Sequence, residues 1–62
     1  MKKFYIITED DTIHNISTRK YDLDFEERMF VAHNCIDNKN PLAERIPEII
    51  IFNIKYIEIR DI

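Results

Sequence analysis

The first third of the chain alternates between apolar and polar segments in a way that predicts a β-hairpin. Residues 3–8 are mostly aromatic or β-branched and predict a strand. The acidic segment 9–11 then predicts a polar turn, and residues 12–18 a second strand. Ile13 and Ile16 are the apolar points of that second strand, and their odd spacing predicts a bulge or an irregular end.

The middle of the chain has the pattern of an amphipathic helix that begins at Asp24. Asp24 followed three residues later by Glu27 has the form of a capping box, in which side chains bond the N–H groups of the first turn. A helix from there to Ile36 or Asp37 would turn one apolar side, made by residues 25, 29, 32 and 36, toward a sheet. The polar segment 37–40 would end it, and a short helical turn over 41–45 would follow.

The last fifteen residues predict strand, but their apolar parity changes within the segment. In the first part of this segment the even-numbered positions are apolar: Ile50, Phe52, Ile54 and Tyr56. In the second part the odd-numbered positions are apolar: Ile57 and Ile59. A strand cannot change face without a bulge or a corner, so we place a corner at 53–55, between strands over 48–52 and 56–60. The predicted fold class is α+β, a small antiparallel sheet with one helix on one face, in the order ββαββ. The alternative is ββαβ, with one long bulged C-terminal strand.

Both faces of this predicted sheet carry apolar side chains, which one helix cannot cover. A second copy of the chain is the simplest cover for the other face, so the pattern predicts a homo-oligomer. Phe30 lies on the polar side of the predicted helix, and we expect it to contact another chain, although a rotated helix would bring it into the core. The alternative for the sheet is a half-wet apolar surface. The predicted interface residues are Tyr5, Ile7, Phe30, Ile49, Ile51 and Tyr56.

The amino-acid composition limits the interactions that could stabilise so short a chain. Sixty-two residues make one domain near the lower limit for independent folding. The single cysteine, Cys35, excludes an internal disulfide, and one cysteine with two histidines is too few for a structural zinc site. We therefore expect no metal and no cofactor, and self-association remains as a source of stability. Because the chain has no glycine, its turns must be built from Asn, Asp or Pro.

Charge and hydropathy bear on partners and location. A net charge of −3 and a pI near 5.2 argue against a duplex-DNA binder, whose affinity depends on Lys and Arg. No apolar run approaches the roughly 18 residues of a membrane span, and the N-terminus leads into a strand with no cleavage site, so we expect a cytoplasmic protein. Ile, Lys, Asn, Phe and Tyr supply nearly half of the chain, as AT-rich coding does, which suits a phage or mobile element.

No arrangement of residues predicts catalysis. Cys35 and His33 point to different sides of the predicted helix, so they cannot form a nucleophile–base pair, and Cys35 is expected in the core. Without glycine there is no Gly-rich phosphate loop. The acidic turn of Glu9, Asp10 and Asp11 would hold a cation or meet a basic partner, but bunched carboxylates at a hairpin tip are far more often a solvated turn. We therefore expect no enzyme.

The resulting functional prediction is a small, homo-oligomeric, non-enzymatic protein-binding protein of unspecified target, such as a phage-encoded inhibitor of a host or defence protein. Steric blocking or charge mimicry needs only a stable acidic scaffold with an apolar patch. The alternative is a small nucleic-acid-binding regulator, which the acidic charge balance disfavours. Its contacts would come from Arg19, Lys20, Lys39 and Lys55, with Tyr21 and Tyr56.

Overall fold

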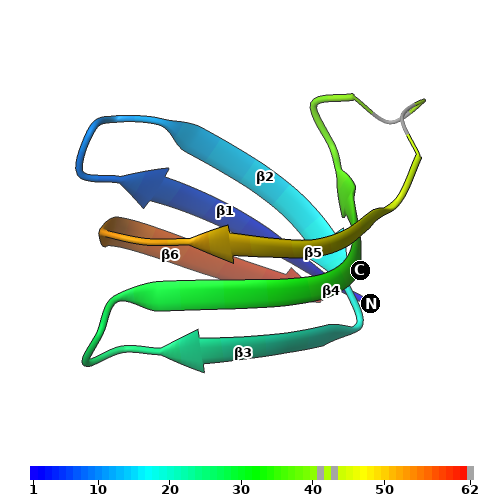
Figure 1. Ribbon diagram of the computed structural model, residues 1–62. Helices are drawn as coiled ribbons and strands as arrows, with labels where there is room; N and C mark the ends of the chain where they lie inside the picture. The colour runs from blue at the N-terminus through cyan, green and yellow to red at the C-terminus, as the bar shows by residue number, and fades with distance from the viewer. Residues whose placement is uncertain (41, 43, 62) are drawn as a thin grey trace.

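The computed structural model describes residues 1–40, 42 and 44–61, and these residues form an all-β fold that contains no helix. Six antiparallel strands curl into a half-barrel (Figure 1). The strands are β1 (Lys2–Thr8), β2 (Ile13–Thr18), β3 (Lys20–Asp24), β4 (Met29–Asp37), β5 (Ile46–Ile51) and β6 (Ile54–Asp61). The predicted α+β class is therefore wrong in both of its forms, ββαββ and ββαβ. In the described part of the chain, no helix has the length and apolar character that a membrane crossing requires.

The predicted N-terminal hairpin is confirmed. Strands β1 and β2 pair antiparallel, with Phe4 opposite Ile16 and Ile7 opposite Ile13. On its other edge β1 pairs with β6, where Phe4 lies opposite Ile59. Strand β1 is thus the centre of a three-stranded sheet, β2–β1–β6.

Strand β4 is the centre of a second three-stranded sheet, β3–β4–β5. Phe30 in β4 lies opposite Leu23 of β3 on one edge and opposite Ile51 of β5 on the other. The last residues of β4 leave this sheet and pair with β2, where Ile36 lies opposite Ser17. Because one strand belongs to both sheets, the two layers curl around a common interior (Figure 1).

The predicted helix over 24–37 is wrong, although its start signal has a real structural counterpart. The Asp24 carboxylate accepts the N–H groups of Glu26 and Glu27 at 3.0 and 3.1 Å, as an N-cap would. These bonds instead close the turn between β3 and β4, because Arg28 has a φ of 53° and cannot continue a right-handed helix. Asp24 favours a turn and a helix start through the same hydrogen bonds, so the local pattern did not separate them.

In strand β4 the alternation of buried and exposed side chains is interrupted. Phe30 and Ala32 are buried, and so is Cys35, which breaks the even spacing. Asn34 has a φ of 50° within the strand, and this left-handed residue changes the side to which the following residues point. The resulting apolar spacing resembles helical periodicity, which is why sequence reasoning assigned a helix.

A corner divides the C-terminal segment as predicted, but it lies at 52–53 rather than 53–55, because residues 54 and 55 already belong to β6. Asn53, with a φ of 56°, lies between β5 and β6, and the register of β6 against β1 shifts beside Ile7 and Thr8. Ile46 is extended in β5, as the following proline predicts. The short helical turn expected over 41–45 includes residues 41 and 43, which lie outside the described residues.

The core fills the space between the two sheets. Three aromatic rings form its centre, with the Phe4 ring 4.7 Å from that of Tyr21 and 4.6 Å from that of Phe30. The buried apolar side chains around them are Phe4, Ile6, Ile16, Phe30, Ala32, Cys35, Ile51 and Ile54. The inner face of the β2–β1–β6 sheet is thus covered by the chain's own second sheet. The prediction that a helix would cover one face of the sheet was wrong.

Candidate functional site

Three chain connections meet at one end of the half-barrel, which we call the turn end: residues 8–12, 24–28 and 52–55. Backbone hydrogen bonds tie them together, from Glu9 N–H to the Asn53 carbonyl at 2.8 Å and from Ile54 N–H to the Arg28 carbonyl at 3.1 Å. The Arg28 guanidinium also donates to the Glu9 carboxylate at 2.7 Å. Lys55 pairs with Asp11 in the same way. Segments that are far apart in the sequence therefore form one surface (Figure 1).

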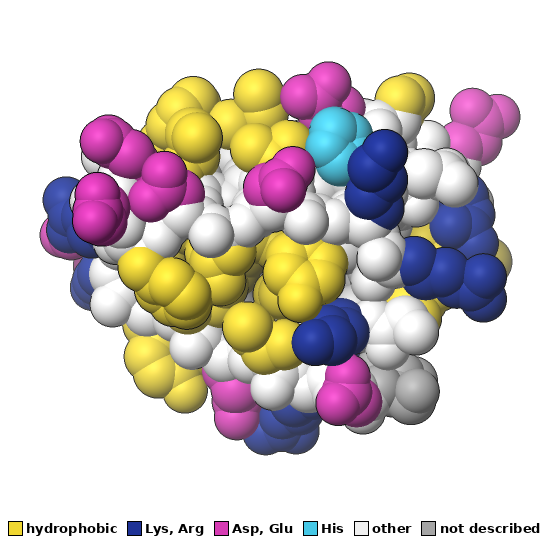
Figure 2. Space-filling view, turned by 90° about the horizontal axis from the view of Figure 1, so that it is seen from below, with side chains coloured by type: hydrophobic (Ala, Val, Ile, Leu, Met, Phe, Trp, Pro, Cys, Tyr) yellow, Lys and Arg dark blue, Asp and Glu magenta, His cyan; other side chains and the backbone are white. Residues whose placement is uncertain are grey.

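The turn end concentrates negative charge. It holds six carboxylates against two cations, a formal net charge of −4, whereas the rest of the chain has seven cations against six carboxylates. Figure 2 shows a cluster of acidic side chains at the left, while the rest of this face carries Lys, Arg and acidic side chains together. The negative charge of the molecule is therefore concentrated at the turn end, and the rest of the chain has a formal net charge of +1.

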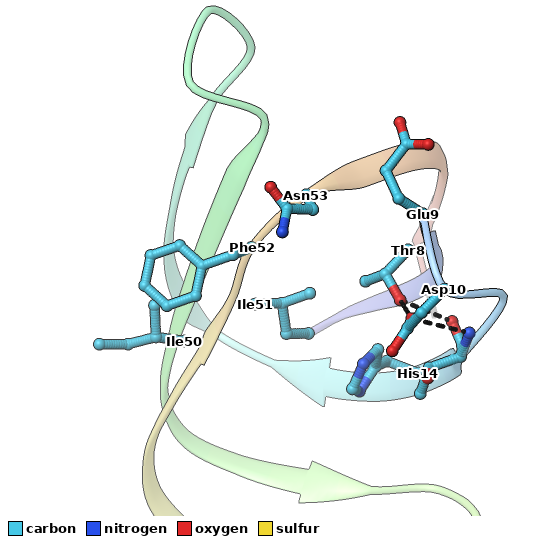
Figure 3. A pocket seen from close by; sticks show the side chains of 9 residues that line it. Thr8, Glu9, Asp10, His14, Ile50, Ile51, Phe52 and Asn53 are labelled. Carbon is cyan, nitrogen blue, oxygen red and sulfur yellow. Dashed lines mark hydrogen bonds between the residues drawn. The ribbon is translucent and has the colours of Figure 1, made fainter.

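The hairpin at this end is internally fixed. The Asp10 carboxylate accepts a hydrogen bond from the Thr8 hydroxyl and another from the Thr12 N–H at 3.2 Å (Figure 3). The Thr8 hydrogen bond, with those of Thr12, lowers the pKa of Asp10. Asp11 adopts a φ of 65°, a conformation that Asp and Asn tolerate better than other non-glycine residues. The acidic turn is therefore a shaped Asx turn held by side-chain hydrogen bonds.

Exposed apolar side chains extend from the turn end over the outer face of the β3–β4–β5 sheet. Phe25 is 73% exposed, Phe52 58% and Ile50 47%. Val31 lies opposite Ile50, and Met29 precedes it on the same face of β4. We call Phe25, Met29, Val31, Ile50 and Phe52 the outer patch.

The shape of the outer patch follows from its elements. Phe25, Met29 and Val31 line a hollow of about 570 Å³ together with the carboxylates of Asp22, Asp24 and Glu26. Figure 3 shows Ile50 and Phe52 projecting to one side of β5, while Ile51 points the other way, into a cleft beside Thr8 and His14. The patch is therefore an apolar surface bordered by acids.

We assign no binding site to two further hollows. The cleft in Figure 3, of about 420 Å³, is lined by residues that already hydrogen-bond one another, Asp10 with Thr8 and Thr12. A second hollow, of about 210 Å³, lies between β3 and β6, where Leu23 and Ile57 pack against the core. Hydrophobic side chains also gather in the middle of the face shown in Figure 2. We attribute both hollows to incomplete closure of the half-barrel.

The six interface residues named from the sequence do not share a surface. Tyr5, Ile7 and Tyr56 lie on the outer face of the β2–β1–β6 sheet, with the Tyr5 and Tyr56 rings 6.4 Å apart. Phe30 and Ile51 are buried in the core, and Ile49 packs against it. Phe30 and Ile51 are therefore not surface residues in this chain, and the contact role of Tyr5, Ile7 and Tyr56 stays a prediction. Phe30 is not an exposed helix residue, because residues 29–37 form the central strand of the second sheet.

Phe25 and Phe52 were missed as surface residues for a related reason. The helix prediction placed Phe25 on the packing face, and the strand prediction gave Phe52 no preferred side. A sequence signal was present, since each phenylalanine lies next to a turn residue, Asp24 or Asn53. An aromatic side chain at a turn has fewer neighbours to cover it than one within a strand.

The cations proposed for nucleic-acid contact are divided among several places. Lys55 is paired with Asp11 at the turn end, and Lys39 donates to the Ile13 carbonyl. Tyr21 is part of the aromatic core, with the Lys2 ammonium 5.7 Å from its ring centre. Arg19 and Lys20 remain together, beside Arg45 and His33. The structure therefore does not join the six residues of that alternative into one surface.

Cys35, the residue considered as a nucleophile, lies in the core. Cys35 is fully buried, and burial raises the pKa of its thiol. Among the described residues, no group of three His, Cys, Asp or Glu side chains could hold a metal ion.

Comparisons with protein-family models, with curated proteins and with solved structures found no match.

Proposed function

We propose that this chain is a non-enzymatic protein-binding protein that docks through the outer patch onto a protein surface with an apolar centre and a basic rim. The observation that carries the proposal is the pair of exposed phenylalanines on a rigid, acid-bordered sheet face. Large apolar side chains grouped at the surface mark contact sites, and aromatic residues dominate the binding energy of such contacts.

Charge selects the chemistry of the partner. The turn end has a formal net charge of −4 and borders the outer patch through Asp24 and Glu26. A surface rich in Lys and Arg would be attracted to it, and an acidic one repelled. The rigid turns favour affinity as well, because little conformational entropy is lost when they bind.

Inhibition is the mode of action that fits these features. A protein that covers a basic surface on its target blocks whatever anionic ligand that surface normally binds, without any catalytic group of its own. We propose this role, the inhibition of a host or defence protein by a phage-type protein, as the biological setting.

Self-association is a separate proposal that concerns the opposite sheet. Tyr56 is 48% exposed and Ile13 38%, and both flank Ile7 on the outer face of β2–β1–β6. Glu58 on this face already pairs with Arg60 of the same chain at 3.0 Å, so the self-association proposal depends on the exposed apolar side chains. Light scattering at two concentrations measures the mass directly; a constant monomer mass would refute this proposal while leaving the outer patch untouched.

The contact surface is tested by placing a photo-crosslinker at position 52 and capturing partners from the lysate of a bacterial host. We expect one crosslinked protein with a basic surface, lost when both phenylalanines are replaced (Phe25→Ala with Phe52→Ala) and weakened by added salt. Tyr56→Ala is the matched control, an exposed aromatic on the other sheet, and should leave capture intact. Equal capture by the double variant, or an acidic partner insensitive to salt, would overturn the proposal.

A further inference from the structure

At the end of the half-barrel opposite the turns, four basic side chains surround a pocket of about 390 Å³. Its lining residues come from the β2–β3 corner, from the bend in β4 and from the segment before β5: Arg19, Lys20, His33, Asn34 and Arg45. The two chain termini lie at the same end (Figure 1). The described residues that line the pocket include no carboxylate, and the nearest acidic residue along the sheet is Glu48, which lies opposite His33 on β5.

The floor of this pocket is rigid because a buried hydroxyl holds its backbone. Thr18 is 1% exposed, and its hydroxyl lies 2.9 Å from the His33 carbonyl and 3.0 Å from the Lys20 carbonyl. The same oxygen accepts the Lys20 N–H at 3.3 Å. The β2–β3 corner, which carries Arg19 and Lys20, is thereby fastened to the bend in β4 that carries His33 and Asn34.

Arg45 is positioned over the same bend. Its guanidinium donates to the Asn34 carbonyl at 3.2 Å, and Asn34 has the left-handed conformation that turns this carbonyl toward it. A guanidinium has five N–H donors, so most of them remain for a ligand. The charge arrangement differs from that of the turn end, where both cations have carboxylate partners. Within the described residues, none of the three ion pairs involves Arg19, Lys20 or Arg45.

We propose that this pocket binds a phosphate group, either as inorganic phosphate or as the terminal phosphate of a small phosphomonoester. Two guanidinium groups offer the forked donors that match phosphate oxygens, and Lys20 adds a point charge. An anion would also relieve the mutual repulsion of the three permanent cations. The compact ligand is favoured over nucleic acid because the acidic turn end repels an extended polyanion.

The proposal is tested by two-dimensional NMR on the whole chain, titrated at constant ionic strength with sodium phosphate, with ribose 5-phosphate and with sodium chloride. We expect saturable shifts of the Lys20, Asn34 and Arg45 amide signals with both phosphates and none with chloride. Tighter binding of ribose 5-phosphate would identify the phosphomonoester as the ligand, and equal binding would identify the phosphate group alone. Absence of saturable shifts with either phosphate would refute the site.

Variants decide whether the named side chains are responsible. We expect the double variant Arg19→Gln with Arg45→Gln to bind about tenfold to a hundredfold more weakly, since it loses two charge-assisted hydrogen-bonding groups. Arg60→Gln, which removes a cation from β6, is the matched control and should bind as the parent does. Unchanged spectra elsewhere report that the variants are folded. Equal weakening by Arg60→Gln, or binding of a single-stranded oligonucleotide but of neither phosphate, would overturn the proposal.

Discussion

The two ends of the half-barrel are built by the same means and carry opposite electrostatics. At each end a left-handed Asn lies at a change of direction, Asn53 at the turn end and Asn34 beside the basic pocket. A threonine side chain braces each end, Thr8 at the first and Thr18 at the second. Yet the cations of the turn end pair with carboxylates, whereas those of the basic pocket converge on a space that no carboxylate lines.

This difference shows that the threonine hydrogen bonds that hold the backbone at each end are independent of how charged side chains are arranged there. Bracing satisfies polar backbone groups at a bend, and it is needed at both ends for stability. Charge placement is not needed for the fold, since pairing exposed cations contributes only about 0–1 kcal/mol. Leaving the cations of the basic pocket unpaired therefore costs the fold little, and the phosphate proposal depends on their placement and not on stability.

The largest expected effect separates the core, which joins both ends, from the exposed patch at the turn end. Phe30→Ala should lower the free energy of unfolding by about 3–5 kcal/mol, because it removes a ring packed against Phe4 and Tyr21. Phe25→Ala should change it by less than about 0.5 kcal/mol, since that ring is exposed. Urea unfolding measures both. Similar losses from the two variants would contradict the assignment of Phe30 to the core.

The next effect compares one threonine from each end. Thr18→Val should cost about 1–3 kcal/mol, because it leaves the carbonyls of Lys20 and His33 without the buried hydroxyl that lies between them. Thr12→Val, at the exposed hairpin of the turn end, should cost less than about 0.5 kcal/mol. Thermal unfolding checks the pair. A Thr18→Val protein as stable as the parent would show that the pocket floor is not held as described.

The third comparison is between the contributions of the two left-handed asparagines, Asn34 and Asn53, to stability. Asn34→Ala and Asn53→Ala should each cost about 1–2 kcal/mol, because alanine adopts this conformation at a higher steric energy. Asn34→Gly and Asn53→Gly should be close to neutral, since glycine tolerates it. Stability measured for the four variants gives the comparison. An alanine variant that matches its glycine counterpart would indicate that the backbone has relaxed at that end.

The smallest expected effect is a pH dependence confined to the turn end. The Thr8 and Thr12 hydrogen bonds lower the folded-state pKa of Asp10, so its contribution is fully present above its unfolded pKa of about 4 and is lost as pH falls through the lower folded value. The parent should therefore lose more stability than Asp10→Asn between pH 5 and pH 2. Glu44→Gln, in the segment before β5, serves as control. Parallel pH profiles for parent and Asp10→Asn would exclude this contribution.

The sequence predicted those elements whose signals are local. The aromatic and β-branched residues at 3–8 and the acidic turn after them identified the first hairpin, and the parity change near Asn53 identified the second corner. It did not predict the turn at 25–28, because Asp24 makes the same hydrogen bonds to N–H groups at a helix start and in a turn. The left-handed Asn34 also interrupts the alternation of buried and exposed side chains in β4, so the sequence pattern did not indicate a strand.

The candidate sites were harder to foresee than the strands. Tyr5 and Tyr56 were placed on an outer surface because strand alternation alone decides their side. Phe25 and Phe52 required knowing that residues 25 and 52 adjoin turns on one face. The basic pocket required the contact between the β2–β3 corner, which carries Arg19 and Lys20, and Arg45, which follows Lys20 by 25 positions (45 − 20).

By itself the sequence determined a short, glycine-free chain with a β-hairpin at one end, a corner near the other and acidic residues concentrated in its turns. Those properties follow from neighbouring residues, whose side-chain alternation and turn chemistry act over a few positions. Only the tertiary structure decided that the middle of the chain is a strand, that Phe30 is interior and that three cations converge. These outcomes depend on pairing between distant segments, because burial between two sheets outweighs the local preference of any one segment.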